Sequence, residues 1–327
     1  MRKLLALPLI AVIACGSEAF KDQARNAMPT KDTVAMGSPQ SQPPTSMSGQ
    51  DTVTQNEAIG SSASFFGLTV ELAVAFNLPV AVFLDLVKHV TEDFEPMSCD
   101  ATSCTWGPGH GPFDFNDFKL VVTKDGGDFD WELSGRPIGA TGDFTVFASG
   151  KATPGPQPHH GSGSFTVDFD KAATLAGPHD GTTGQLIVSN YSNVGPAQLA
   201  VQFIGARDTD PTHPAGQKNN VAYQYANNNT GGGDLQIAVK NTVPGNGDNF
   251  SVHSQWKNDG RGRADVEGQG GGVAVQLSEC WSAAPFLVQY FQSTITLNLP
   301  PFGGPAQGDN SACAYPGDPS YSTLTAP

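Results

Sequence analysis

The sequence predicts a mainly β protein, in which a large, curved antiparallel meander sheet, an incomplete barrel, packs on an N-terminal pair of apolar helices. Three observations predict this fold. From Phe113 onward, apolar and polar residues alternate with a period of two in segment after segment. Turns rich in Gly and Asn separate these segments. Residues 65–90 form the one long apolar run outside the N-terminus, and its spacing is helical.

The N-terminus predicts export. Arg2 and Lys3 form a positive region, and residues 4–13 form an apolar stretch too short to span a membrane by itself. The following Val12-Ile13-Ala14-Cys15 resembles the lipobox of bacterial lipoproteins. That resemblance, which covers about the first sixteen residues, implies that Cys15 is diacylated, that the chain is cut just before it, and that the new amine is acylated. Several acyl chains would anchor the protein to a bilayer, because each buried CH₂ contributes about 0.8 kcal/mol.

The residues around this motif refine the expectation. Residues 1–14 would be the signal peptide, and Gly16, rather than Asp, follows the cysteine. In enteric-type lipoprotein families, Asp at that position signals retention in the inner membrane, so the analogy favours an outer-membrane lipoprotein. The alternative is an ordinary secretory signal, with Cys15 in a cleaved or frayed N-terminus.

A tether is expected after the anchor. Residues 16–62 are rich in Ser, Thr, Gln and Pro and contain almost no large apolar residue, so with Cys15 they form the predicted segment 15–62. Such a composition buries too little surface to offset its ordering entropy, which predicts a disordered tether.

The helical pair is predicted over residues 63–97. Pro79 suits the first turn of a helix and Asn77 can cap it, so we expect two short helices that meet there. A transmembrane hairpin would need about twenty apolar residues per crossing, and each half is shorter. An interfacial helix would need a basic polar face, whereas the sequence offers Lys88 and His89. Packing of the apolar stripe under the sheet is therefore favoured.

The antiparallel β domain is predicted over residues 98–327 and holds about ten strands. Asp125-Gly126-Gly127 is one of the expected hairpin turns, because Gly and Asn accept the positive φ that tight turns need. The Pro- and Gly-rich tail after Leu299 is expected to be held near the sheet by Cys313 and then to fray. The alternating segments are 128–133, 164–170, 186–190, 197–203, 220–226, 234–240, 250–256, 272–278 and 293–299.

The cysteines predict two disulfides. Four remain when Cys15 is set aside, and an even number in an exported protein favours disulfide bonds over a metal site. Of the three connectivities, we expect local pairing, Cys99 with Cys104 and Cys280 with Cys313, because it closes the smallest loops.

Composition and motifs exclude several functions. The chain has 17 Lys and Arg against 31 Asp and Glu and no clustered basic face, which argues against nucleic acid as a partner. It lacks GxSxG, HExxH, P-loop and strand–helix GxGxxG motifs, so no catalytic residue, cofactor or metal site is predicted. His159-His160 is the best metal candidate, but adjacent residues of an extended chain point apart. Carboxylates such as Asp128, Asp130 and Asp168 are expected to be solvated on polar strand faces.

One local cluster suggests a ligand surface. Trp256 and Arg263 flank the one basic concentration and are the candidate ligand-binding residues for a sugar or an anion. The alternative places Trp256 in the core and the nearby arginines at a hairpin tip or paired with Asp259 and Asp265.

The predicted function is that of a non-enzymatic, membrane-anchored cell-envelope lipoprotein that binds a hydrophobic ligand between sheet and helices. The alternative is a surface module that binds glycan or protein, and a hydrolase is the third choice. The order of tether, helices, Gly-rich strands and late Cys280-Trp281 is similar to bacterial lipoproteins with no established activity. The expected fold is also similar to lipoprotein carriers whose curved sheet shelters lipid against helices, although a fold does not determine function.

Overall fold

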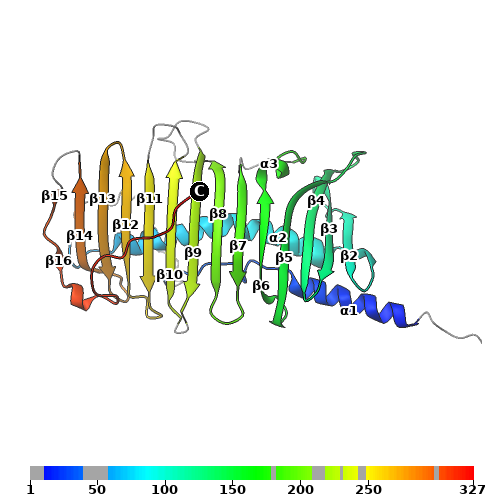
Figure 1. The fold of residues 1–327 in the computed structure, drawn as a ribbon, viewed down its shortest axis with the longest axis horizontal. Helices are drawn as coiled ribbons and strands as arrows, with labels where there is room; N and C mark the ends of the chain where they lie inside the picture. The colour runs from blue at the N-terminus through cyan, green and yellow to red at the C-terminus, as the bar shows by residue number, and fades with distance from the viewer. Residues whose placement is uncertain are drawn as a thin grey trace, which may run out of the picture.

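The structure is a computed structural model, which describes residues 11–39, 58–177, 182–207, 218–228, 231–241, 248–297 and 302–327, apart from the side chains of 11–17 and 302. The predicted fold class is confirmed. Strands β1 to β15 follow one another in chain order as antiparallel neighbours in one sheet that is not closed, and β16 pairs with β14 (Figure 1). The edges of this row are short strands, which limits pairing with other chains.

The strands begin two residues before the predicted β domain. Their bounds are β1 Pro96–Cys99, β2 Ser103–Gly109, β3 Asn116–Asp125, β4 Asp128–Pro137, β5 Thr145–Gln157, β6 His160–Asp168, β7 Gln185–Ser192 and β8 Gln198–Arg207. The others are β9 Lys218–Asn227, β10 Gly233–Asn241, β11 Asn249–Trp256, β12 Gly262–Gly270, β13 Val273–Trp281, β14 Val288–Thr296, β15 Phe302–Gly303 and β16 Gln307–Gly308. Short helices are α3 Phe169–Ala172 and the 3₁₀ helix η1 Asn310–Ala312.

The two faces of the sheet have different partners. Helices α1 (Ala11–Ala27) and α2 (Ser64–Asp93) lie against one face, here called the inner face, whereas the C-terminal tail crosses the other, the outer face (Figure 1). The period-two alternation explains the division, because it points Leu120, Trp131 and Phe165 to the inner face, where they are buried. The predicted Gly126 turn joins β3 to β4 with a φ of 63°.

The predicted helical pair is one helix. α2 runs without interruption over 30 residues, with Pro79 inside it, and Asn77 does not cap a second helix. The missing N–H of Pro79 leaves the carbonyl of Ala75 without its helical partner, and Ala75 lies on the exposed side, where solvent can bond to that carbonyl. Phe65 and Leu84, one on each side of the proline, are fully buried against the sheet, so packing favours the continuous helix.

Residues of the sheet hold α2 in place at its N-terminus. Ala63, which precedes the helix, has no side-chain oxygen for a cap. Glu279 of β13 supplies one: its carboxylate accepts the N–H of Phe65 at 2.9 Å and the hydroxyl of Ser64 at 3.3 Å. One turn later, the hydroxyl of Thr69 lies 2.8 Å from that of Ser254 on β11. These buried polar contacts fix the position of α2 across the strands.

The predicted tether differs from the structure over residues 18–39. Phe20 and Ala24 lie four residues apart on α1, Met28 follows its last residue, and all three are buried on the inner face. Phe20 packs against Phe129 with ring centroids 5.7 Å apart. The residues after α1 are also held, because Met36 exchanges two hydrogen bonds with the Asn77 side chain at 2.8 and 2.9 Å. The prediction failed because small and flexible apolar residues were not counted as core. Residues 40–57 lie outside the described part.

α2 also carries an exposed apolar stripe. Val74, Leu78 and Val82, four residues apart, are 62–63% exposed on the side away from the sheet. Among the helices of the described residues, α2 alone is long and apolar enough to cross a membrane. This test uses length and composition only and is weak evidence of a span. The argument from shortness against a span therefore fails, since it assumed two helices, while the packing of the opposite side on the sheet is as predicted.

The predicted disulfide pairing is confirmed. Cys99 and Cys104 are bonded across β1 and β2, where they are also partners in the strand register. Cys280 of β13 is bonded to Cys313, just after η1. Trp281 beside Cys280 is fully buried. The second disulfide fixes the start of the C-terminal tail to the sheet.

Candidate functional site

The two candidate ligand-binding residues do not share a surface. Trp256 is 2% exposed on the inner face, where it stacks on Tyr225 with ring centroids 6.1 Å apart. Arg263 is 4% exposed on the outer face and pairs with Asp265 at 3.0 Å. The predicted joint surface is therefore wrong, because the two side chains point to opposite faces of the sheet. The alternative is correct for Trp256 and for the pair with Asp265, and Arg261 pairs with Asp259 at 2.9 Å.

A groove with a mixed polar and apolar lining lies on the outer face of β3 to β7, here called the outer groove. Its volume is about 620 Å³. In Figure 1 these strands lie beyond the end of the C-terminal tail. Five strands about 4.8 Å apart give the groove a width of roughly 19 Å. The polar and aliphatic side chains that line it are Val121, Thr123, Asp130, Glu132, Ser149, Lys151, Ser164, Thr166, Ile187 and Ser189.

Strand register places these groups in rows. Glu132 lies opposite Ser149, which lies opposite Thr166 on the next strand. The neighbouring row contains Asp130 opposite Lys151. Each row therefore offers hydrogen-bonding groups at regular steps across the strands, one step per strand.

Lys151 organises the charges at one end of the outer groove. Its ammonium lies 2.7 Å from Asp125, 3.5 Å from Asp130 and 3.8 Å from Asp128. The hydrogen bond to Asp125 raises the pKa of Lys151, and the same bond lowers the pKa of the Asp125 carboxyl. One cation thus faces several carboxylates, and the groove keeps a net negative charge.

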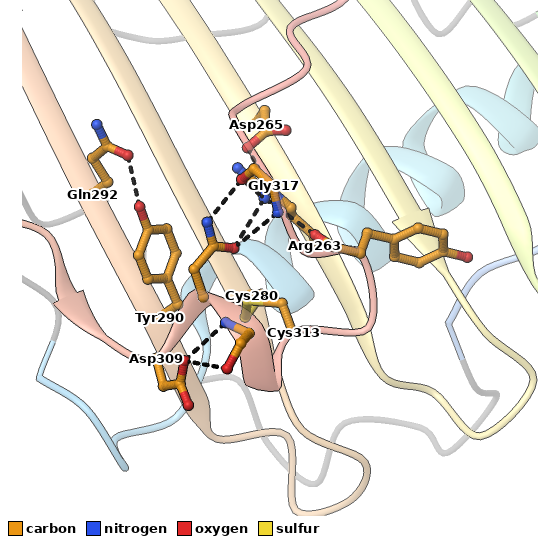
Figure 2. Close-up of a disulfide and its surroundings, with 11 residues drawn as sticks. Arg263, Asp265, Cys280, Tyr290, Gln292, Asp309, Cys313 and Gly317 are labelled. Atoms are coloured by element: carbon orange, nitrogen blue, oxygen red, sulfur yellow. Dashed lines mark hydrogen bonds and ion pairs between the residues drawn. A yellow bond between two sulfur atoms is a disulfide. The ribbon is translucent and has the colours of Figure 1, made fainter.

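The outer face of β9 to β13 is covered by the chain itself. Residues 309–327, here called the strap, are bonded to β13 near their start by the Cys280–Cys313 disulfide and cross these strands in the direction of β9 (Figure 1). Figure 2 shows Arg263 beneath the strap, where its Nη1 donates to the carbonyls of Tyr315 and Gly317 at 3.1 and 2.8 Å. The predicted fraying of the tail is wrong, because side chains of the sheet bind its main chain.

His253 of β11 also binds the strap. Its Nδ1 lies 2.6 Å from the carbonyl oxygen of Ser320, and its Nε2 lies 3.1 Å from Asp234 Oδ1. Both ring nitrogens face acceptors, so the doubly protonated imidazolium fits this site best. Burial opposes the charge, but the bonds to Asp234 and Ser320, with the nearby Asp265, raise the pKa of His253 above its ordinary 6.5. Burial likewise opposes the charge of Asp234, whose pKa is nevertheless lowered by hydrogen bonds from His253 and Gln255.

The contact between α2 and the sheet is closely packed. Phe83 stacks on Phe165 and Trp131 with ring centroids 5.6 and 6.3 Å apart. Five hollows can be described: three lie on the outer face and two beside α1 and the segment that follows it. Of these five, only the hollow beside the segment that follows α1 touches α2, where Leu84, Asp85, Lys88 and Glu92 line it opposite Pro158, His159 and His160.

No group of three His, Cys, Asp or Glu in the described residues is arranged to hold a metal ion. His159, one of the predicted metal candidates, instead directs Nδ1 at the carbonyl of Met28, 3.2 Å away. Asp128 and Asp130 face solvent on the outer face, as the sequence indicated.

Sequence reasoning did not single out the outer groove. Thr166 was interpreted only as a polar position of an alternating strand, and Ser149 and Lys151 lie in β5, which was not among the predicted segments. Nothing in the alternation distinguishes a solvated face from a ligand-binding face. Two signals were present for the inner face: Glu279 and Ser254 occupy positions where the period of two requires apolar residues. Comparison with protein-family models, curated proteins and solved structures found no match to this chain.

Proposed function

We propose that this protein is a non-enzymatic, lipid-anchored binding module of the cell envelope, whose outer groove holds an extended, neutral glycan. The observation that carries the proposal is the groove itself: an open channel about 620 Å³ in volume, lined by rows of hydroxyls and carboxylates that face solvent. Sites for small apolar ligands are enclosed and mostly apolar, whereas this groove is shallow and crosses five strands.

The chemistry of the outer groove selects among polymers. The carboxylates of Asp130 and Glu132 accept hydrogen bonds from sugar hydroxyls, and the Lys151 ammonium donates them. Hydroxyls of Ser149, Ser164 and their neighbours do both. Because the carboxylates outnumber the one cation, and the chain has a formal charge of −14, a polyanionic glycan is disfavoured. A neutral strand with repeated hydroxyls fits best.

The anchor would hold the domain close to the membrane. Cys15 lies in α1, five residues before the buried Phe20, which corresponds to about 8 Å along a helix. Strands β1, β2 and β5 pack against α1. If Cys15 is acylated, these three strands would lie next to the bilayer. The protein would then have a short connection to the membrane in place of the long tether that the composition suggested.

Binding to glycans tests the proposal. The full mature chain would be measured against neutral polysaccharides (xylan, dextran and a β-glucan) and a polyanion (heparin). Removal of a charged hydrogen bond in Asp130→Asn or Glu132→Gln changes the free energy by about 1.5–3 kcal/mol, so we expect about 10- to 100-fold weaker binding. The matched control Glu71→Gln makes the same change of charge on α2, where Glu71 is exposed, and should bind as the wild type does.

Two results would contradict the proposal. Equal loss of glycan binding in Glu71→Gln would indicate an effect of overall charge rather than of the outer groove. Tight binding of heparin alone would overturn the choice of a neutral ligand. The anchor is tested separately by metabolic labelling with palmitate, which should label the wild type and leave Cys15→Ala unlabelled.

A further inference from the structure

The strap is bound chiefly through its main chain. Side chains from four consecutive strands, β9 to β12, each reach a peptide N–H or carbonyl. Asp265 and Gln236 accept the N–H groups of Ser320 and Thr323 at 2.8 and 3.2 Å. The other main-chain contacts are Arg263 with Tyr315 and Gly317, His253 with Ser320, and Asn220 with the carbonyl of Pro327 at 2.6 Å.

The side chains of the strap contribute less. The hydroxyls of Ser322 and Thr323 approach Gln236 at 3.4 and 3.5 Å, which are long hydrogen bonds. Lys257 lies over the ring of Tyr315 at 5.6 Å. Ala314 and Ala326 are buried, so the surface accommodates small residues at those points. A surface that hydrogen-bonds to main-chain N–H and C=O groups and has space for small side chains recognises an extended backbone conformation more than a particular sequence.

The strap does not use all the hydrogen-bonding capacity beneath it. Arg263 Nη2 and the Ser278 hydroxyl are both buried and have no partner in the part of the chain that the structure describes. A buried polar group without a partner is costly, so these atoms favour an occupant that supplies further acceptors. The strap therefore leaves these two groups available to an occupant that supplies acceptors.

We infer that the outer face of β9 to β12 is a binding site for an extended, Ser-, Thr-, Ala- and Pro-rich segment of another polypeptide, and that the strap is its intramolecular competitor. The Cys280–Cys313 bond keeps the strap at a high effective concentration, so the site stays covered until residues 314–327 lift away. The disulfide itself remains intact in this exchange, because it precedes the segment that moves.

Proline substitution separates main-chain from side-chain recognition. Ser320→Pro removes the N–H that Asp265 accepts, whereas Ser320→Ala keeps it and removes only the hydroxyl. In the full-length oxidised chain, Ser320→Pro should expose the strap to chymotrypsin after Tyr321, and Ser320→Ala should protect it as the wild type does. Thr323→Pro, which removes the N–H bonded to Gln236, is a milder second variant in case the first fails to fold.

Peptide capture then tests the site. The probe is a fluorescent peptide with the sequence of residues 314–327, together with a scrambled peptide of the same composition. We expect Ser320→Pro to bind the probe about 100-fold more tightly than wild type or Ser320→Ala, because the tethered competitor has gone. The scrambled peptide should bind within about threefold of the probe, because the contacts are to the main chain. Asp130→Asn in the outer groove should leave capture unchanged.

Three outcomes would overturn the inference. Equal protection of the strap in Ser320→Pro, Thr323→Pro and Ser320→Ala would show that main-chain bonds do not hold it. A released strap without peptide capture would show that the surface is no binding site. If Ser320→Pro self-associates and does not capture the peptide, the occupant of the surface would be the strap of a second copy of this chain, and not a segment of another polypeptide.

Discussion

The buried carboxylate of Glu279 provides a sharp test of how the sheet positions α2. Glu279 lies on β13 and is fully buried, and it accepts the N–H of Phe65 from a residue 214 positions earlier in the chain. Replacing it with Ala removes the acceptor and leaves that N–H buried without its partner. Replacing it with Gln keeps an oxygen at the same place and removes the charge.

The expected loss follows from the contacts. A hydrogen bond to a charged group contributes about 1.5–3 kcal/mol, and a carboxylate at a partly buried helix N-terminus adds up to about 2 kcal/mol. These terms overlap, so we expect Glu279→Ala to lower the free energy of unfolding by about 3 kcal/mol and Glu279→Gln by about 1–2 kcal/mol. The control is Glu267→Gln. Glu267 lies on β12, and the one hydrogen bond that the structure gives its side chain is from Gln276 at 2.9 Å, so we expect this substitution to lower the free energy of unfolding by less than about 0.5 kcal/mol.

Urea unfolding of the disulfide-intact chain gives the change in free energy, and hydrogen exchange at the Phe65 amide reports the local effect. Faster exchange at Phe65 in Glu279→Ala, without faster exchange in the distant strands, is the expected signature of a lost cap. If Glu279→Ala unfolds within 0.5 kcal/mol of wild type, the capping argument is wrong. If Glu279→Gln alone is neutral, the hydrogen bond holds the helix and the charge does not.

Three further predictions concern the strap and the core. Protection of the strap should be complete below pH 6.5, the ordinary His value, and should fall as the pH rises through the raised pKa of His253; His253→Gln should abolish this dependence. Phe83→Ala should cost about 3–5 kcal/mol of stability in urea unfolding, against less than about 0.5 kcal/mol for Val82→Ala on the exposed side of the same helix. Replacing Cys280 and Cys313 together with Ser should cost about 3–4 kcal/mol, by the loop-entropy model for a separation of 33 residues, and should speed proteolysis of the strap; unchanged proteolysis would show that the strap is held without its disulfide.

Much of the fold was predictable because it repeats one local rule. The period of two assigned inner and outer faces along the strands, and Gly and Asn turns joined neighbours, so a meander followed without long-range information. The disulfides followed from the short separation of each pair. Residues 65–90 were correctly predicted to be helical and to pack against the sheet, although as two helices, since an apolar stripe of that length has to be covered.

The failures have a common cause. Pro79 favours a helix start by itself, but packing of Phe65 and Leu84 on the sheet stabilises a continuous helix by more than the proline costs. Residues 18–39 look too polar to fold alone, yet Phe20 and Met36 find partners that the sheet and α2 supply. In each case a tertiary contact outweighs a local preference.

The sequence by itself predicted the fold class, the alternation of faces, the disulfide pairs and a candidate anchor at Cys15, since each of these follows from a local pattern or from the smaller loop that a pairing closes. Only the tertiary structure decided what covers each face. Trp256 and Arg263 are seven residues apart and yet lie on opposite sides of the sheet, the first stacked on Tyr225 at the inner face and the second under the strap. The outer groove and the strap site are likewise products of register, because side chains from four or five strands form one surface only when the sheet aligns them.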